Sequence, residues 1–188
     1  MQRSGVVRPG QDPRAGVWET PDWLFRPLNE LLGFELDCAA LPGNAKCPRF
    51  YTPKDDALKQ SWDAPAWFCN PPFGQNPGTG SWVAKARSEA WKYDAIGVMV
   101  LPVKADSAWW HDEVWGWNRV QASGRLDAGR LSGRWYQLDH SPMRVELLEL
   151  RGRISYGGAD GTGWSASAIL VLNSPRLPIL PRLGPLSQ

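Results

Sequence analysis

The feature that most constrains the fold is the run from Ala66 to Phe73, AWFCNPPF. Proline fixes its own φ and cannot donate a backbone hydrogen bond, and the residue before a proline is driven towards an extended conformation. Asn70-Pro71-Pro72-Phe73 therefore forms a stiff corner that neither a helix nor the interior of a strand can contain. The four apolar residues before it predict a buried strand that ends where the corner begins.

The rest of the chain alternates predicted strands with predicted helices. Residues 95–101 are apolar throughout and stop at Pro102, which is typical of a central parallel strand. Thr20 and Pro21 suit a helix start, with Gly33 as its end, and a second helix is expected over 81–93. Further strands are predicted at 34–40, 50–52 and 167–172, with hairpins and a loop in 118–160. This alternation predicts an α/β fold with a mostly parallel central sheet flanked by helices.

The chain of 188 residues suits one domain of ordinary size. We expect a flexible arm over 1–16, a globular domain over 17–174 and a proline-rich tail over 175–188. A net charge of +2 without a block of like charges permits a nucleic-acid partner but does not require one. Three cysteines fit neither a disulfide framework nor a zinc pattern, so we expect a reducing cytoplasm and no metal. No apolar run is long enough to span a membrane, and no signal peptide is expected.

Asp37 and Asn70 are both expected directly after strands, and ligands of open α/β sheets bind beyond the carboxyl ends of the strands. The two residues would then share one crevice. The Asn70 Oδ1 atom and the Pro71 carbonyl are two acceptors, which matches the two donors of an exocyclic amino group on a nucleobase. Phe73 offers a face on which a base can stack, once the base has left its duplex. For Asp37, a solvated carboxylate that caps a loop is the alternative.

The corner resembles motif IV of the S-adenosylmethionine-dependent amino-methyltransferases that modify adenine N6. Other motifs resemble the small phage-type, Dam-like DNA N6-adenine methyltransferases, and the resemblance runs from about Trp18 to Val171. In chain order these motifs are Trp18-x-Thr20-Pro21, Leu24-Phe25, Phe34-x-Leu36-Asp37-x-Ala39-Ala40, Asn44-x-Lys46-Cys47, Tyr51-Thr52, Asp56-x-Leu58, Trp62, Leu101-Pro102, Trp109-Trp110, Gly152-Arg153-Ile154 and Ser167-Ala168.

The resemblance implies a Rossmann-like class I methyltransferase that transfers a methyl group to adenine N6 in duplex DNA after base flipping. It implies S-adenosylmethionine as cofactor, S-adenosylhomocysteine as product, and the cytoplasm of a bacterium or phage-infected host. The implied catalytic residues are Asn70, Pro71, Pro72 and Phe73. The implied cofactor-binding residues are Trp18, Thr20, Pro21, Asp37, Ala39, Ala40, Asp55 or Asp56, and Asn70.

Alternatives remain open at this point. RNA adenine or a protein glutamine amide also presents an amino group. Ala39-Ala40 stands where glycines are usual in the wider superfamily, so a nucleic-acid-binding module with weak catalysis is another alternative. Region 118–160 is the one segment with room for DNA recognition, and its arginines either contact phosphates or form a solvated face. These arginines are Arg125, Arg130, Arg134, Arg144, Arg151 and Arg153. Trp109 and Trp110 suit packing or base contact, and the oligomeric state, a monomer included, is open.

Overall fold

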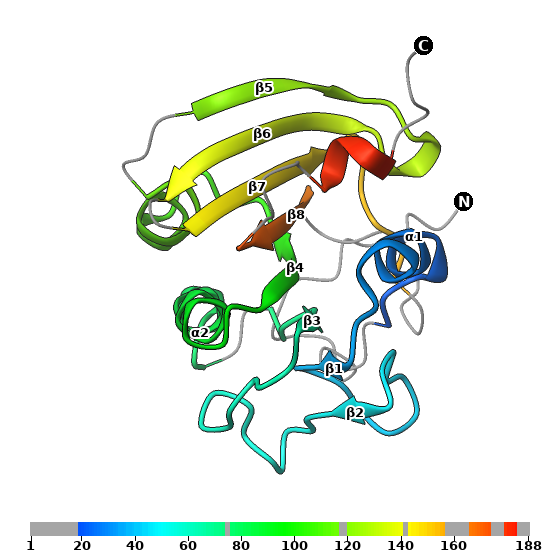
Figure 1. Ribbon diagram of the computed structural model, residues 1–188, viewed down its shortest axis with the longest axis vertical. Helices are drawn as coiled ribbons and strands as arrows, with labels where there is room; N and C mark the ends of the chain where they lie inside the picture. Colours follow the sequence, from blue (N-terminus) through cyan, green and yellow to red (C-terminus); the bar gives the residue numbers. More distant parts are fainter. Residues whose placement is uncertain are drawn as a thin grey trace, which may run out of the picture.

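The computed structural model describes residues 19–73, 76–116, 120–140, 143–156, 166–173 and 179–183. The described residues form one eight-stranded sheet with the strand order β2-β1-β3-β4-β8-β7-β6-β5 (Figure 1). The strands are β1 (Leu36–Asp37), β2 (Arg49–Phe50), β3 (Ala66–Cys69), β4 (Ile96–Pro102), β5 (Val120–Leu126), β6 (Gly133–His140), β7 (Met143–Leu150) and β8 (Ser167–Leu172). The two α-helices of the described residues are α1 (Asp22–Leu32) and α2 (Thr79–Lys92). The predicted arm over 1–16 lies outside the described residues.

The sheet is mixed, so the predicted mostly parallel sheet is wrong. Strands β2, β1, β3 and β4 run parallel to one another, whereas β8, β7, β6 and β5 continue the sheet through antiparallel pairs. For two of the four antiparallel pairs the cause lies in the connections, since two residues separate β6 from β7 and six separate β5 from β6. A connection this short reverses the chain, since parallel neighbours need a crossover of a dozen or more residues. The hairpins expected in 118–160 are present, but they extend the main sheet.

Helix α1 covers one face of the sheet. It begins one residue later than predicted, with Pro21 at the N-cap and no capping hydrogen bond from a side chain. It runs through Pro27 without interruption and ends at Gly33, whose left-handed φ of 65° closes the helix as predicted. Leu24, Phe25 and Leu28 point into a core that includes Phe34 and Phe68. Thr20 does not cap the helix, so its hydroxyl is available for another contact.

Helix α2 lies on the opposite face (Figure 1). Here the core is built from tryptophans, of which Trp62, Trp67 and Trp110 are fully buried. Trp67 of β3 lies directly across from Gly97 of β4, and a Cβ atom on Gly97 would lie 2.1 Å from the Trp67 ring. The indole therefore requires glycine at this position. Trp110 belongs to a π-helical turn over Trp110–Trp115 and contacts Trp109 edge to face at 5.5 Å, which supports packing as its role.

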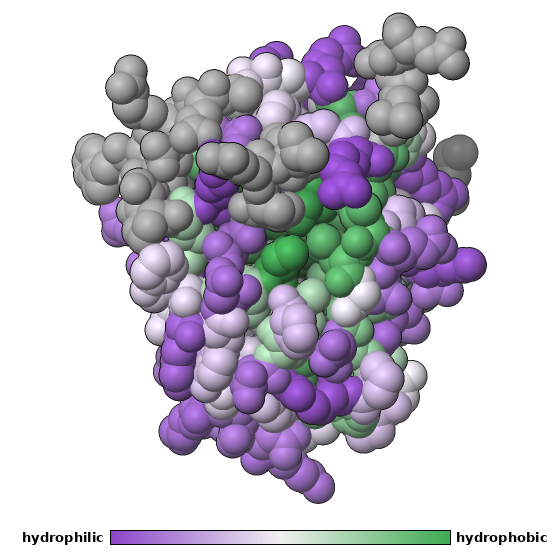
Figure 2. Space-filling model, in the orientation of Figure 1, coloured by the Kyte–Doolittle hydropathy of each residue, from purple (hydrophilic) through white to green (hydrophobic). Residues whose placement is uncertain are grey.

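The C-terminal segment is anchored to the sheet by a buried carboxylate. Glu146 of β7 is fully buried and accepts hydrogen bonds from the backbone N–H groups of Ile179 and Leu180, at 2.6 and 2.7 Å. Leu180 begins a short 3-10 helix over Leu180–Leu183, and Ile179 directly precedes it. Figure 2 shows apolar residues gathered in the middle of one face, over the region that β3, β4 and α1 occupy in Figure 1. No described helix has the length and apolar character that a membrane crossing needs.

Candidate active site

The Asn-Pro-Pro-Phe corner lies at the carboxyl ends of the parallel strands. Asn70 directly follows β3, which pairs in parallel with β1, so Asp37 at the end of β1 lies beside the end of β3. Asn70 thus follows a strand as predicted, whereas Asp37 is the last residue of its strand, and of the two only Asn70 lines the pocket at this edge of the sheet, so the predicted shared crevice is not found. The strand ends are fixed by burial, since both residues of β1 and all four of β3 are buried.

A pocket of about 310 Å³ opens at this edge of the sheet. Its walls come from the loop after β1, the segment after β2, the corner itself and helix α2. Seven of the sequence-predicted site residues line it: Ala39, Ala40, Asp56, Asn70, Pro71, Pro72 and Phe73. Small side chains at Ala39 and Ala40 leave room for a ligand to approach the backbone. The pocket thus brings the predicted catalytic corner and part of the predicted cofactor site together.

The side chain of Asn70 is oriented by Thr20. Its Nδ2 atom donates a hydrogen bond to Thr20 Oγ1 at 3.1 Å, across 50 positions of the sequence. Thr20 is 4% exposed, so this hydroxyl is held in a dry environment. Because the two terminal atoms of an amide point in different directions, a fixed nitrogen also fixes the direction of Oδ1. Thr20 therefore determines which atom of the amide can act as an acceptor in the pocket.

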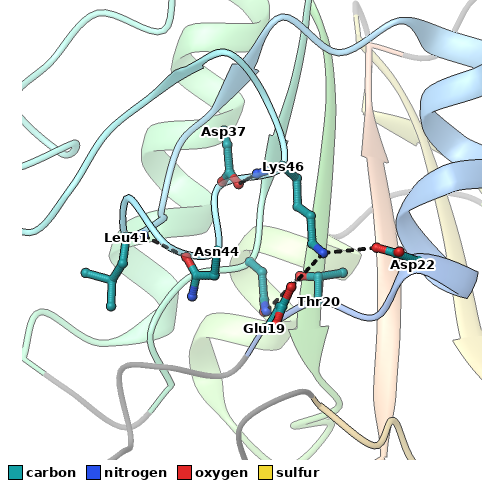
Figure 3. Close-up of polar contacts among 8 residues, drawn as sticks. Glu19, Thr20, Asp22, Asp37, Leu41, Asn44 and Lys46 are labelled. Atoms are coloured by element: carbon teal, nitrogen blue, oxygen red, sulfur yellow. Dashed lines mark hydrogen bonds and ion pairs between the residues drawn. The ribbon is translucent and has the colours of Figure 1, made fainter.

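Asp37 shapes the loop after β1 and is absent from the residues that line the pocket. Its Oδ2 atom accepts the backbone N–H of Lys46 at 3.0 Å (Figure 3), and its Oδ1 atom accepts that of Ala39 at 3.3 Å. Burial raises the pKa of the Asp37 carboxyl, and these two N–H groups partly offset the rise. The carboxylate therefore holds both ends of a loop that contributes Ala39 and Ala40 to the pocket wall.

Lys46 joins that loop to the segment before α1. Its Nζ atom forms ion pairs with Glu19 at 3.0 Å and Asp22 at 3.1 Å, and in Figure 3 the lysine side chain extends towards both carboxylates. Burial lowers the pKa of Lys46, but the hydrogen bonds that its Nζ atom donates to both acids more than compensate and raise the pKa overall. Thr20 lies between the two acids in sequence. The ion pairs thus fix the backbone on either side of the residue that orients Asn70.

Of the two adjacent acids, Asp56 lies on the pocket wall and Asp55 does not. Asp55 closes a turn, since its Oδ2 atom accepts both the N–H and the hydroxyl of Thr52 at 2.7 Å, and the hydroxyl in particular lowers its pKa. Asp56 has a left-handed φ of 52° and forms an ion pair with Lys59 at 2.7 Å. Aspartate tolerates this conformation better than most residues. The chain path therefore favours Asp56 as the acid that faces a ligand.

Phe73 is only 8% exposed and contacts the ring of Tyr156 edge-on at 6.5 Å. It belongs to the core on the α1 side and also lines the pocket. Packing and ligand contact are thus combined in one ring.

Other predicted residues lie outside the pocket lining. Pro21 is the N-cap of α1, and its carbonyl accepts the N–H groups of Leu24 and Phe25 at 3.0 and 3.2 Å. Trp18 lies outside the described residues.

The pocket also contains Tyr51 and Trp82, to which the sequence assigned no role. Tyr51 lay within a motif of the family resemblance, but Trp82 gave no local signal. The Trp82 indole N–H is buried and has no hydrogen-bond partner among the described residues.

The three cysteines are buried and free. Burial raises the pKa of Cys47 to about 12 and that of Cys38 well above its ordinary value, so neither is a thiolate nucleophile at neutral pH. Within the part of the chain that the structure describes, no group of three or more His, Cys, Asp or Glu residues is placed to hold a metal ion.

Comparison with known proteins places this geometry in a family. The family model described as DNA N-6-adenine-methyltransferase (Dam) matches residues 10–159. The chain belongs to the Dam family.

One relative is the DNA N-6-adenine-methyltransferase of Haemophilus phage HP1, 30% identical over 111 residues. That match covers 58% of this chain and 60% of the phage protein, so the chain spans less than two thirds of that relative. YfdM of Escherichia coli strain K12, which carries the name of a methyltransferase, is 41% identical over 63 residues, or 30% of this chain and 69% of YfdM. The corner, the pocket and the residues from Glu19 to Asp22 lie inside the part matched by the Dam model.

Proposed function

We propose that the chain transfers a methyl group from S-adenosylmethionine to the N6 amino group of adenine in DNA. The observation that carries this proposal is the Asn-Pro-Pro-Phe corner on the pocket wall, with the Asn70 amide oriented by Thr20. Membership of the Dam family and the phage relative named for this activity support it.

The corner acts on the substrate amino group through two acceptors. Asn70 Oδ1 and the Pro71 carbonyl each accept one N–H of the adenine amino group, which draws the nitrogen lone pair out of conjugation with the ring. The nitrogen would then form a bond to the methyl carbon as the bond between that carbon and sulfur breaks, which releases S-adenosylhomocysteine, and one proton would pass from the nitrogen to solvent. S-adenosylmethionine, when bound, supplies an electrophilic methyl group on a sulfonium. Rigid placement of both acceptors accounts for most of the acceleration, because they need no rearrangement during the reaction.

The pocket residues fit a nucleoside-type cofactor. A volume of about 310 Å³ lies within the range of small-molecule sites, which is roughly 300–1,000 Å³. Asp56 supplies a carboxylate for hydroxyl or amino groups, and Trp82 supplies a buried N–H donor. Asp37 acts by holding the loop of Ala39 and Ala40, in addition to the contact with the cofactor amino group that the resemblance implies. For Trp18, Pro21 and Asp55, a role in cofactor binding stays a prediction.

The target base must leave the duplex to reach a pocket of this size. We propose that Phe73 contacts the flipped base, since its ring both lines the pocket and is held in place by the core. Stacking on an aromatic ring contributes about 1–3 kcal/mol per base, which offsets part of the lost pairing and stacking.

The test is transfer of a radiolabelled methyl group from S-adenosylmethionine to DNA free of adenine methylation, to RNA and to a protein mixture. Label in the DNA alone is the expected result. Label in RNA or in protein alone would assign the same corner to a different amino group. No label in any acceptor, together with S-adenosylhomocysteine binding in the titration calorimeter, would indicate a binding module that lacks turnover.

A further inference from the structure

A second groove lies at one end of the antiparallel strands, separate from the pocket. Five arginines and two acids line it, which leaves three net positive charges. We call it the arginine groove, and its arginines are Arg125, Arg130, Arg134, Arg151 and Arg153. All five are exposed. Arg144, the sixth arginine predicted for this region, lies near the other end of β7 and does not line the groove.

Ion pairs among the described residues do not account for these charges, although Arg130 lies over the ring of Trp23 at 5.8 Å from its centroid. Within the described residues, none of the five arginines forms an ion pair. Arg125 of β5 lies directly across from Arg134 of β6, and like charges at opposed positions of an antiparallel pair destabilise it. The two acids have other contacts, since Asp127 accepts from Ser132 at 3.0 Å and Glu149 from Tyr136 at 3.3 Å. On its other side Arg134 lies directly across from Glu149 of β7, yet no ion pair joins the two within the described residues. An opposed arginine pair that no ion pair neutralises suits an anion that comes from outside the chain.

The topology places the arginine groove on the same edge of the sheet as the corner. Strands β3, β4, β5 and β7 end at this edge, and β6 and β8 begin there. The register pairs that establish this are Pro102 with Ser167, Ala168 with Glu149, Leu150 with Gly133, and Gly133 with Leu126. One ligand that follows this edge would therefore pass both sites.

The spacing of the two sites matches a DNA duplex. Strand β7 lies three strands from β3 and β5 lies five strands from it. At about 4.8 Å per strand, the arginines lie about 14–24 Å from the corner. At about 3.4 Å per nucleotide along the duplex axis, this distance corresponds to about four to seven phosphates. Both sites then fall within one helical turn of about 34 Å.

We propose that the arginine groove binds backbone phosphates of the DNA that enters the pocket, on one side of the target adenine. The proposal rests on the proposed function for the identity of the anion. The planar guanidinium group of arginine pairs with phosphate oxygens through two parallel hydrogen bonds, a geometry that the ammonium group of lysine cannot form. Phosphate contacts set position and affinity and carry no base sequence, so the groove should bind unrelated duplexes alike.

Fluorescence anisotropy with a labelled 30-bp duplex of mixed sequence tests the groove. The affinity of the full chain is measured over a range of salt concentrations for wild type, Arg125→Gln and the double variant Arg125→Gln/Arg134→Gln. Each lost phosphate contact should reduce the slope of log K against log salt by about 0.9. The double variant should therefore lose about two units of slope, whereas affinity for S-adenosylhomocysteine should stay unchanged.

Lys92→Gln is the matched control, because it removes one positive charge from an exposed site at the opposite end of the sheet. Helix α2 starts after the end of β3, spans about 21 Å and ends at Lys92, from which the chain enters the beginning of β4. Lys92 therefore lies near the end of the sheet where β4 begins, away from the end that carries the groove. The salt slope of Lys92→Gln should equal that of wild type. A wild-type slope in both arginine variants, or an equal loss in Lys92→Gln, would overturn the proposal.

Methyl transfer by the same samples separates this proposal from the proposed function. Groove-dependent DNA binding by a wild-type protein that methylates nothing would support the groove and refute the activity. Methylation of DNA by wild type, with binding that is unaffected in the double variant, would support the activity and refute the groove.

Discussion

Replacing Thr20 with valine should separate the orientation of Asn70 from the binding of the cofactor. Valine keeps the shape of threonine and lacks the hydroxyl that accepts the Asn70 Nδ2–H at 3.1 Å. Thr20 is 4% exposed, so water has little access to this position and would not readily replace the lost hydroxyl as an acceptor for the amide N–H. An unsatisfied buried polar group costs about 1–3 kcal/mol. Because about 1.4 kcal/mol corresponds to a tenfold change in rate, kcat/KM for methyl transfer should fall by about 5- to 150-fold.

The assay combines steady-state methyl transfer with calorimetric titration of S-adenosylhomocysteine. Thr20→Val should reduce turnover while the affinity for S-adenosylhomocysteine changes less than about twofold, and Thr20→Ser should recover most of the rate because it restores the hydroxyl. The opposite pattern, a large loss of S-adenosylhomocysteine affinity with unchanged turnover at saturation, would refute the positioning role. It would assign Thr20 to cofactor packing, as the sequence resemblance implies.

Three other substitutions test the pocket and its support. Asp37→Ala should raise the Kd for S-adenosylhomocysteine by about 10- to 150-fold, the equivalent of about 1.5–3 kcal/mol for hydrogen bonds to a charged group; an unchanged Kd in calorimetry would show that the loop keeps its shape without the carboxylate. Phe73→Leu should keep the fold and lower methyl transfer on matched duplex DNA by about 5- to 150-fold, with a smaller loss at mismatches, where the base is extruded more easily. Phe73→Tyr should retain most of the activity. A Phe73→Leu variant as active as wild type would show that Phe73 serves only in packing. Gly97→Ala should lower the free energy of unfolding in urea by about 3 kcal/mol or more, because the new methyl group overlaps the Trp67 ring; a change below about 1 kcal/mol would mean that the indole can move aside.

The local features of the sequence predicted the local features of the structure. The apolar run before Pro102 identified β4, and the two prolines identified the corner, because both signals depend on neighbouring residues alone. Gly33 marked the end of α1 for the same reason, since only its left-handed φ was needed. The carboxyl-end rule for α/β sheets then placed the corner at the edge of the sheet where the pocket opens.

Features that depend on distant contacts could not be read in this way. Hairpin signals in 118–160 predicted chain reversals, but the pairing of β7 with β8 decides that these hairpins extend the sheet. Thr20 resembled a helix cap because its hydrogen-bond partner lies 50 residues away. Asp55 and Asp56 could not be distinguished from their residue type, since the difference comes from the turn that occupies the Asp55 carboxylate.

The central claim, that the corner around Asn70 methylates adenine at N6, is tested most directly by mass spectrometry of the reacted DNA. DNA free of adenine methylation is incubated with S-adenosylmethionine and either wild type or Asn70→Ala, digested to nucleosides and analysed. We predict that wild type yields N6-methyl-2′-deoxyadenosine. Asn70→Ala should yield at least about a hundredfold less, which is the usual effect of losing one preorganised polar contact to the transition state. A methyl group at any other position of any base, or an Asn70→Ala variant within a few-fold of wild type, would contradict the account.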